Sequence, residues 1–389
     1  MTSLRLEIPD ALEQARAALA QGDAARARAV LETVISEGRA DTDIWLSLAH
    51  AAILQNDLAQ KLAAIDSALA LSPTDIRALI AKADHLASEG QQRAAAAYYS
   101  TALQVAPPLD RAPPRLREAL ERARAASDAI ARELEDFVRA RLVADGVAAP
   151  GAPARFSRAV DILFGRKRAY VQQPRYLYYP ELPNVQFYER DAFPWLDAVE
   201  AATPDILEEL HGVLGPAFTP YVTQTPGRPR NDQMGLVDDP GWSALFLHKD
   251  GAEQAFAGAC RKTMAALADA PLTRIPGRTP SVLFSKLAAR AHIPPHTGML
   301  NARLICHLPL IVPDGCAFRV GNDVRSWKVG AAWAFDDTIE HEAWNKGNAD
   351  RYILIFDVWR PELDVEERAC VSALCQAIDA YRSDVSWDG

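Results

Sequence analysis

The sequence predicts a two-domain α+β protein, with an all-α helical-repeat solenoid over residues 1–150 and a β-rich domain with flanking helices over residues 151–389. Three observations support this division. In the first hundred residues, similar residues recur at a fixed interval. A stretch rich in proline and alanine follows this region. The C-terminal part contains short apolar alternations separated by turns. At 389 residues, the chain is also longer than one ordinary domain.

The recurring positions are Gly22, Asn56 and Gly90, which stand 34 residues apart between helical runs rich in alanine and leucine. Small residues share another column of the same alignment: Ala15, Ala49 and Ala83. Only a small side chain fits where paired helices pack closely. The pattern resembles tetratricopeptide repeats, which implies three repeats over residues 8–108 and a concave groove for a peptide or partner protein. A helical spacer or dimerisation arm is an equally good interpretation.

Residues 115–145 have the pattern of one long amphipathic helix, with glutamate and arginine pairs at helical spacing. We expect this helix to cap the solenoid with a polar face. The sequence V-A-A-P-G-A-P that follows is the best linker in the chain. The domain boundary is therefore predicted near Gly151.

The overall charge and hydropathy argue against several functional classes. A formal net charge of -9 disfavours nucleic-acid binding, which requires a basic surface. The N-terminal residues lack the pattern of a secretory signal, and no apolar run is long enough to span a membrane. We therefore expect a cytoplasmic protein that binds neither nucleic acid nor membrane.

The C-terminal part contains short alternating runs that predict the strands of a barrel or a double-sheet jelly roll. These runs are 281–287, 303–312, 317–320, 324–329, 331–335 and 352–358. Three of the eight histidines, His296, His307 and His341, lie in this region, with Arg351 downstream. Two histidines on neighbouring strands with a cation beyond them would suit a metal and an anionic co-substrate.

Three motifs in this region resemble the aspartyl/asparaginyl beta-hydroxylase family: P-P-H-T-G-M-L-N-A-R-L-I-C-H-L-P-L, F-D-D-T-I-E-H-E-A-W and R-Y-I-L-I-F-D-V-W-R-P-E-L. The resemblance implies a double-stranded beta-helix, which is a cupin-like jelly-roll barrel. It also implies a dioxygenase that uses iron(II), 2-oxoglutarate and O2. Such an enzyme converts 2-oxoglutarate to succinate and carbon dioxide while it hydroxylates an unactivated carbon, and no catalytic residue is expected beyond the metal and co-substrate ligands.

The same resemblance assigns the metal ligands to His296 and His341. Most oxygenases of the wider superfamily add a carboxylate two residues after the first histidine. This chain has Gly298 at that position, and the family likewise lacks the carboxylate. Either Asp336 or Asp337 could supply a third ligand. We favour the alternative that they orient His341 or shape the turn, and that water completes the coordination sphere.

The co-substrate contacts implied by the resemblance are Arg351, Ser285, His307 and Trp242. Arg351 would bind the distal carboxylate of 2-oxoglutarate, because a guanidinium forms two parallel hydrogen bonds to a carboxylate. Ser285 would add a hydroxyl and His307 a third contact. Trp242 would form an aromatic wall of the pocket, although ordinary core packing would explain this residue as well.

One departure from the family concerns the substrate. The animal hydroxylase has an arginine two residues before His307, where this chain has Ile305. Arg303 or Arg319 could replace it in binding acidic groups. The leading hypothesis is hydroxylation of the beta-carbon of an Asp/Asn-type residue in a peptide or protein recruited by the repeats. The alternatives are a non-catalytic binding or sensing protein and a hydroxylase of a small molecule or lipid-linked acyl chain.

Overall fold

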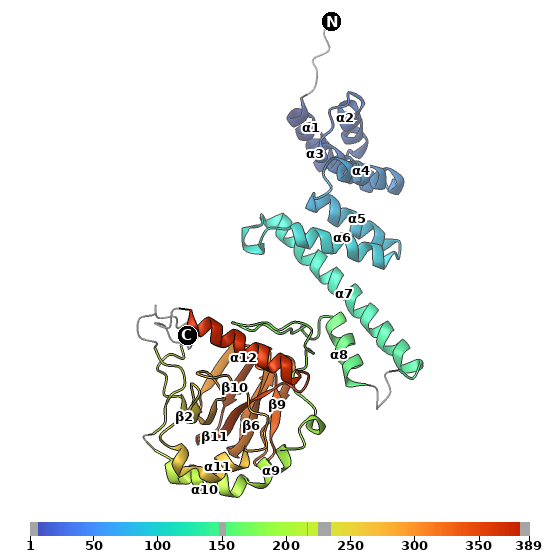
Figure 1. The fold of residues 1–389 in the computed structure, drawn as a ribbon. Coiled ribbons are helices and arrows are strands. Elements are labelled where there is room, and N and C mark those ends of the chain that lie inside the picture. The colour runs from blue at the N-terminus through green and yellow to red at the C-terminus, as the bar shows by residue number, and fades with distance from the viewer. Residues whose placement is uncertain (1–6, 148–152, 216, 225–234, 382–389) are drawn as a thin grey trace. The chain divides into compact units, whose positions relative to one another are not determined.

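The computed structural model describes all residues except 1–6, 148–152, 216, 225–234 and 382–389. Contacts divide the chain into two compact units, with the division between Phe164 and Gly165 (Figure 1). The sequence placed this division at residue 150, which lies outside the described residues. The two units are described separately below.

The first unit begins with antiparallel helical pairs, as predicted. Their helices are α1 (Ile8–Ala20), α2 (Ala24–Ser36), α3 (Thr42–Leu54), α4 (Leu58–Leu71), α5 (Ile76–Ser88) and α6 (Gln92–Val105). The turns within the pairs hold Gly22, Asn56 and Gly90 at φ values of 78°, 57° and 74°. Glycine and asparagine tolerate this left-handed conformation best, which explains the 34-residue interval. The alanine column is buried, so the tetratricopeptide-like packing is confirmed.

The predicted long helix is α7 (Pro114–Ala144), and it is followed by α8 (Ala154–Leu163). Arg139 joins the two helices, because its guanidinium contacts Glu135 at 2.8 Å and Asp161 at 2.9 Å. Residues up to Phe164, and with them α8, belong to the helical unit. The unit therefore ends 14 residues later than the boundary predicted from the linker composition.

The second unit contains two antiparallel sheets. The larger sheet has the strand order β1-β2-β4-β11-β6-β9, with β3 paired to β2, and the smaller sheet has the order β5-β10-β7-β8. The strands of the larger sheet are β1 (Thr219–Pro220), β2 (Trp242–Lys249), β3 (Ala252–Glu253), β4 (Val282–Leu287), β6 (Arg303–Ile311), β9 (Trp333–Phe335) and β11 (Arg351–Trp359). The smaller sheet contains β5 (His292–His296), β7 (Cys316–Val320), β8 (Asp323–Arg325) and β10 (His341–Asn345).

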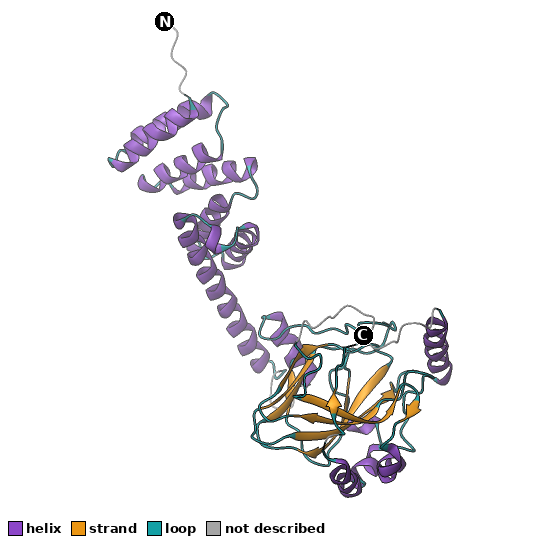
Figure 2. Cartoon of the chain, turned by 90° about the vertical axis from the view of Figure 1, so that its left-hand side faces the viewer, coloured by secondary structure: helices purple, strands orange, loops and turns teal. Residues whose placement is uncertain are grey.

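The strands form two hydrogen-bonded sheets in the described part of the unit, and these sheets are not closed into one barrel. The prediction of a jelly-roll type of fold is confirmed, whereas the closed barrel is corrected to an open pair of sheets. An apolar cluster that includes Phe318, Phe335 and Ile353 packs residues from both sheets against one another. Figure 2 shows the strands gathered together, with helices outside them.

Helices cover the outer side of the larger sheet. They are α9 (Leu196–Ala201), α10 (Thr203–Val213) and α11 (Arg261–Ala266), and their apolar residues join a second cluster with Cys306. The neighbouring His307 points the other way and packs near Phe318, as expected for adjacent strand residues. The larger sheet therefore has one face against helices and one face toward the smaller sheet.

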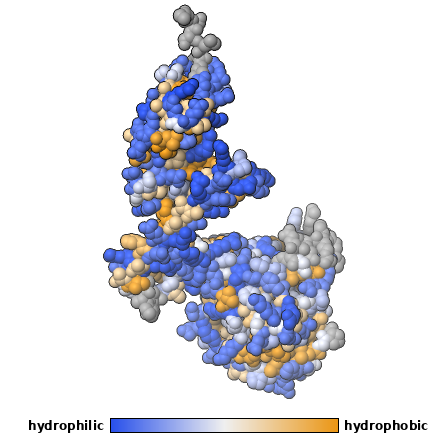
Figure 3. Space-filling view, turned by 180° about the vertical axis from the view of Figure 1, so that it is seen from behind, coloured by the Kyte–Doolittle hydropathy of each residue, from blue (hydrophilic) through white to orange (hydrophobic). Residues whose placement is uncertain are grey.

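The last helix, α12 (Val365–Ala380), packs through Val371 and Cys375 against Trp359 at the end of β11. No helix among the described residues is long and apolar enough to cross a membrane. In the view of Figure 3, hydrophilic residues cover most of the helical unit, with smaller groups of hydrophobic residues between them.

Candidate active site

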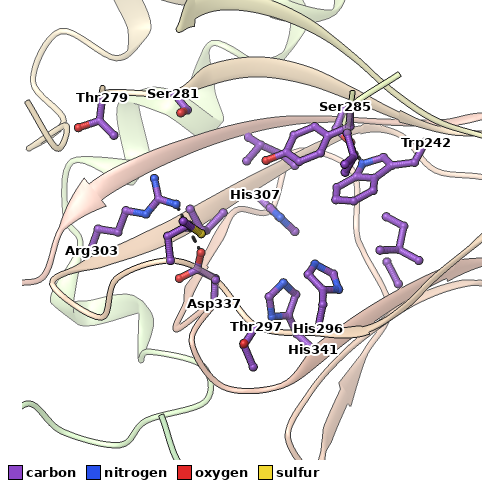
Figure 4. Close-up of a pocket in the computed structure, with 18 of the residues that line it drawn as sticks. Trp242, Thr279, Ser281, Ser285, His296, Thr297, Arg303, His307, Asp337 and His341 are labelled. Carbon is purple, nitrogen blue, oxygen red and sulfur yellow. Dashed lines mark hydrogen bonds and ion pairs between the residues drawn. The ribbon is translucent and has the colours of Figure 1, made fainter. Parts of the chain in front are cut away.

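The two predicted metal ligands lie side by side on neighbouring strands of the smaller sheet. His296 ends β5 and His341 begins β10, and the two residues are direct partners in the antiparallel ladder. Partners in such a ladder present their side chains on the same face. The two imidazole centroids are 4.1 Å apart, and Figure 4 shows the rings together at the floor of the pocket.

Backbone carbonyls fix the tautomers of both histidines. The Nδ1 atom of His296 lies 2.8 Å from the Pro294 oxygen, and the Nδ1 atom of His341 lies 3.0 Å from the Ile339 oxygen. A carbonyl oxygen only accepts, so each Nδ1 must carry the proton. Each Nε2 is then left with the lone pair that a metal requires.

Burial keeps these imidazoles in the neutral form. It lowers the pKa of His296, to which the nearby Arg175 guanidinium also contributes. It holds the pKa of His341 well below the usual range, with a further contribution from His296. A neutral imidazole in the Nδ1–H tautomer can bind a metal through its Nε2 atom.

No set of three histidine, cysteine, aspartate or glutamate residues able to hold a metal occurs in the described chain. Two residues after His296, a Cβ atom placed on Gly298 would collide with the carboxylate of Asp337. The space beside Gly298 is therefore filled by a carboxylate from the turn that precedes His341.

The structure separates the roles of the two neighbouring aspartates. Asp336 is fully buried and is ion-paired with Arg360, and it accepts hydrogen bonds from the Thr338 hydroxyl at 2.6 Å and the Gln172 amide at 2.7 Å. Asp337 instead lines the pocket, where its Oδ1 atom has no hydrogen-bond partner among the described residues. Burial raises the pKa of Asp337 to about 6. Of the two, only Asp337 faces the histidine pair.

We expect Asp336→Asn to lower the free energy of unfolding of this unit by about 3 to 5 kcal/mol, because it leaves the buried Arg360 charge without its partner. Urea unfolding followed by tryptophan fluorescence measures this loss, since all but one of the eight tryptophans belong to the second unit. Asp205→Asn is the control. It removes an exposed contact to Lys262 and should cost about 0 to 1 kcal/mol. Equal losses in both variants would contradict the prediction.

The proposed co-substrate residues line the same cavity, which has a volume of about 630 Å³, and the Trp242 ring centroid lies 5.9 Å from that of His296. Arg351 is only 1% exposed, and its Nε and Nη2 atoms have no hydrogen-bond partner within the described chain. Burial lowers its pKa to about 10. A buried guanidinium without an anion is costly, so an anion bound beside Arg351 would offset that cost.

The other three residues surround that position. Ser285 is fully buried on β4, and its hydroxyl oxygen accepts a hydrogen bond from the Trp242 indole nitrogen at 3.3 Å. Trp242 in turn stacks on Tyr221 with ring centroids 4.1 Å apart. The Nδ1 atom of His307 has no partner among the described residues, and burial together with the Arg351 charge holds its pKa well below the usual range. All these residues line the cavity.

The two arginines suggested for substrate binding have different surroundings. Arg303 lines the cavity, where its Nη1 atom lies 2.6 Å from Asp357 and its Nη2 atom 3.6 Å from Asp337. Arg319 is not among the described lining residues, because its guanidinium is held by Glu340 at 2.9 Å and by Glu342. Ile305 also lines the cavity. The structure therefore brings Arg303 and Ile305 to the site and keeps Arg319 away from it.

Sequence reasoning missed several polar residues that line the site or contact residues beside it. Asp357 and Arg360 are fully buried at the end of β11, in a run that the sequence shows as otherwise apolar. A charged residue inside such a run signals a buried partner, so this signal was available. Gln172 and Arg175 carried no comparable signal, because they lie in an extended segment without regular structure.

Both units contain residues that match known protein families. Residues 200–361 match the sequence model described as aspartyl/asparaginyl beta-hydroxylase, and residues 18–84 match a tetratricopeptide repeat model. A relative from Rhizobium tropici, described as ornithine lipid ester-linked acyl 2-hydroxylase, is 36% identical over 48% of this chain and 64% of its own length. The human aspartyl/asparaginyl beta-hydroxylase is 38% identical over 37% of this chain and 19% of its own length.

The chain thus spans less than two thirds of the length of each of these relatives. Among solved structures, the Schizosaccharomyces pombe Cnp3 cupin domain is 7% identical, with a TM-score of 0.22 over 39% of this chain and 77% of that one. That likeness is too low to inform the site.

Proposed function

We propose, from the match of residues 200–361 to the aspartyl/asparaginyl beta-hydroxylase model, that the protein belongs to this family and is an iron(II)- and 2-oxoglutarate-dependent hydroxylase. One observation carries the proposal. The paired neutral imidazoles of His296 and His341 share a cavity with a buried guanidinium, that of Arg351, which has no anionic partner in the described chain.

The residues present suit both groups. The Nε2 atoms of His296 and His341 would bind iron(II), for which imidazole is a suitable ligand. Arg351 and the Ser285 hydroxyl would hold the distal carboxylate of 2-oxoglutarate. When bound, iron(II) and 2-oxoglutarate supply the oxidising chemistry for hydroxylation of a carbon, with O2 as the oxidant.

The protein's own contribution is orientation and exclusion of water. The carbonyl oxygens of Pro294 and Ile339 fix the two imidazole rings, so that both Nε2 atoms are preorganised. Apolar side chains, among them Phe318, Phe335 and Ile305, line the cavity between the histidines and Arg351. An apolar wall limits water near the reacting carbon. No side-chain base is required for the abstraction of hydrogen from an unactivated carbon.

Anaerobic addition of iron(II) and then 2-oxoglutarate to the full chain tests this proposal. We expect a weak visible charge-transfer band that appears only when both are present, followed by succinate formation after O2 is admitted. A folded protein that binds iron(II) but develops no band, and forms no succinate, would overturn the proposal. A non-catalytic sensing protein would develop the band without forming succinate.

For the substrate, we propose the beta-carbon of an Asp/Asn-type residue in a peptide or protein that the repeats recruit. The human relative's description and the tetratricopeptide match support this substrate class. A second candidate, a lipid-linked acyl chain, is favoured by the Rhizobium tropici relative and by Ile305 in the cavity wall. Mass spectrometry after turnover distinguishes them, because the added oxygen atom appears in either the peptide or the acyl chain.

A further inference from the structure

An extended segment that precedes the matched family region contacts both histidine-bearing turns. The backbone nitrogen of Gln173 donates to the Thr338 oxygen at 2.7 Å, on the turn before His341. The backbone nitrogen of Arg175 donates to the Gly298 oxygen at 2.9 Å, on the turn after His296. Residues 172–177 therefore lie directly over the edge of the candidate metal site.

Side chains reinforce this attachment. The Gln172 amide nitrogen donates to Asp336 at 2.7 Å, while its amide oxygen accepts from the Asn301 amide at 2.8 Å. The backbone nitrogen of Tyr176 donates to Met299 at 2.9 Å, and Leu177 bridges to Leu300. With contacts on both sides of Arg175, the backbone of Arg175 is held in one position relative to the cavity.

Arg175 differs from the other arginines that line the cavity. Arg303 is ion-paired with Asp357, and Arg278 is ion-paired with Asp379. Arg351 is buried at the proposed co-substrate position. The Arg175 side chain is exposed at the cavity, and its guanidinium has no ion-pair or hydrogen-bond partner among the described residues. It is thus a cation available to a ligand that enters from solvent.

Ile305 makes this position more important. Ile305 contributes no charge to the strand that carries His307, and Arg303 already shares its charge with two carboxylates, Asp357 and Asp337. An anionic substrate group therefore has little uncompensated positive charge to meet on β6. Among the described arginines that line the cavity, Arg175 is the exposed one. Charge-assisted hydrogen bonds from a guanidinium fork suit a carboxylate.

We propose that Arg175 binds a carboxylate of the substrate and that residues 172–177 form a substrate-binding part of the site. This inference rests on the proposed hydroxylase function, because it places the substrate in the same cavity. The carboxylate can belong to an aspartyl side chain or to an amphiphile with an acyl chain, since the two sources present the same group to the guanidinium.

Binding measured by calorimetry on the full chain, with Mn(II) and 2-oxoglutarate present, tests the proposal without turnover. The probes are two pairs that differ in charge: a capped peptide with a central aspartate or asparagine, and dodecanoate or dodecanol. We expect the anionic member of at least one pair to bind the unsubstituted protein about tenfold more tightly. Arg175→Gln should reduce that ratio to about one, and Arg175→Lys should retain part of it. The pair that shows the preference identifies the source of the carboxylate.

Arg168→Gln is the matched control. Arg168 is an exposed arginine near the same segment, and it is not among the described residues that line the cavity. Arg168→Gln changes the net charge by the same amount as Arg175→Gln. It should keep the full preference. The proposal is overturned if neither pair shows a preference for the anion, if the preference survives Arg175→Gln, or if Arg168→Gln abolishes it as well. Because binding is measured without turnover, these outcomes can be interpreted even if the iron(II) band does not appear.

Discussion

Alanine at either His296 or His341 is expected to lower iron(II) affinity by more than about a hundredfold and to abolish succinate formation. Loss of a residue that merely supports a metal ligand costs about 10- to 100-fold, and these two residues supply the Nε2 atoms themselves. No set of three metal-binding side chains in the described chain can compensate. Anaerobic iron(II) titration and a succinate assay measure the two effects.

His292→Ala is the control for this experiment. His292 lies on the same strand as His296, is half exposed, and contacts Glu342 at 2.8 Å at the surface of the sheet. Its replacement should leave iron(II) affinity within about threefold of the unsubstituted protein, because surface substitutions usually change a free energy by about 0.5 kcal/mol or less. Retained turnover in His296→Ala or His341→Ala would refute the assignment of that ligand.

Arg351→Met should weaken 2-oxoglutarate binding by about 2 to 5 kcal/mol, which raises the KM for 2-oxoglutarate roughly 30-fold to several-thousand-fold. The same change should stabilise the protein without ligand by about 1 to 3 kcal/mol, because it removes a buried charge whose Nε and Nη2 atoms have no partner among the described residues. The opposite signs of the two effects separate a binding role from a structural one.

Thermal unfolding with Mn(II), in the presence and absence of 2-oxoglutarate, measures both effects. Ligand at a hundredfold excess over its Kd adds about 2.7 kcal/mol to the stability of the unsubstituted protein. That increment should fall below about 1 kcal/mol in Arg351→Met at the same ligand concentration. Arg351→Lys keeps a charge but lacks the guanidinium fork, so it should recover only part of the increment. A full increment in Arg351→Met would contradict the assignment.

Much of the helical unit was predictable because its signal is local. Left-handed turns select glycine or asparagine at Gly22, Asn56 and Gly90, and close helix packing selects alanine between them. The long helix α7 was predicted within one residue at each end, because its amphipathic pattern is uninterrupted. The end of the unit was not predicted. The boundary was placed at the linker by its composition, whereas α8, which follows the linker, contacts α7 through Arg139 and Asp161.

The strands that carry the histidine pair were harder to predict than the histidines. Several strands of the larger sheet, including β4, β6 and β11, follow their apolar alternation. In contrast, β5 contains Pro294 and Pro295, which argue against a strand, and β10 is only five residues long. The direct pairing of His296 with His341 is a property of the register, which short-range patterns do not determine.

The sequence does not predict which partner each charged side chain contacts. Asp336 and Asp337 are adjacent, yet one is neutralised by Arg360 and the other lines the cavity. Arg303 and Arg319 both have suitable positions on strands. Arg319, however, is held by two glutamates and is not among the described residues that line the cavity. Such differences arise from residues brought together by the fold.

The position of residues 172–177 also affects how fragments of this protein should be designed. A recombinant fragment cut at the start of the family match, residue 200, would lack the donors that Gln172, Gln173 and Arg175 provide to the turns beside the histidines. The carbonyl oxygens of Thr338 and Gly298 would then lose these partners. The shortest fragment that retains the complete site must therefore begin before Gln172.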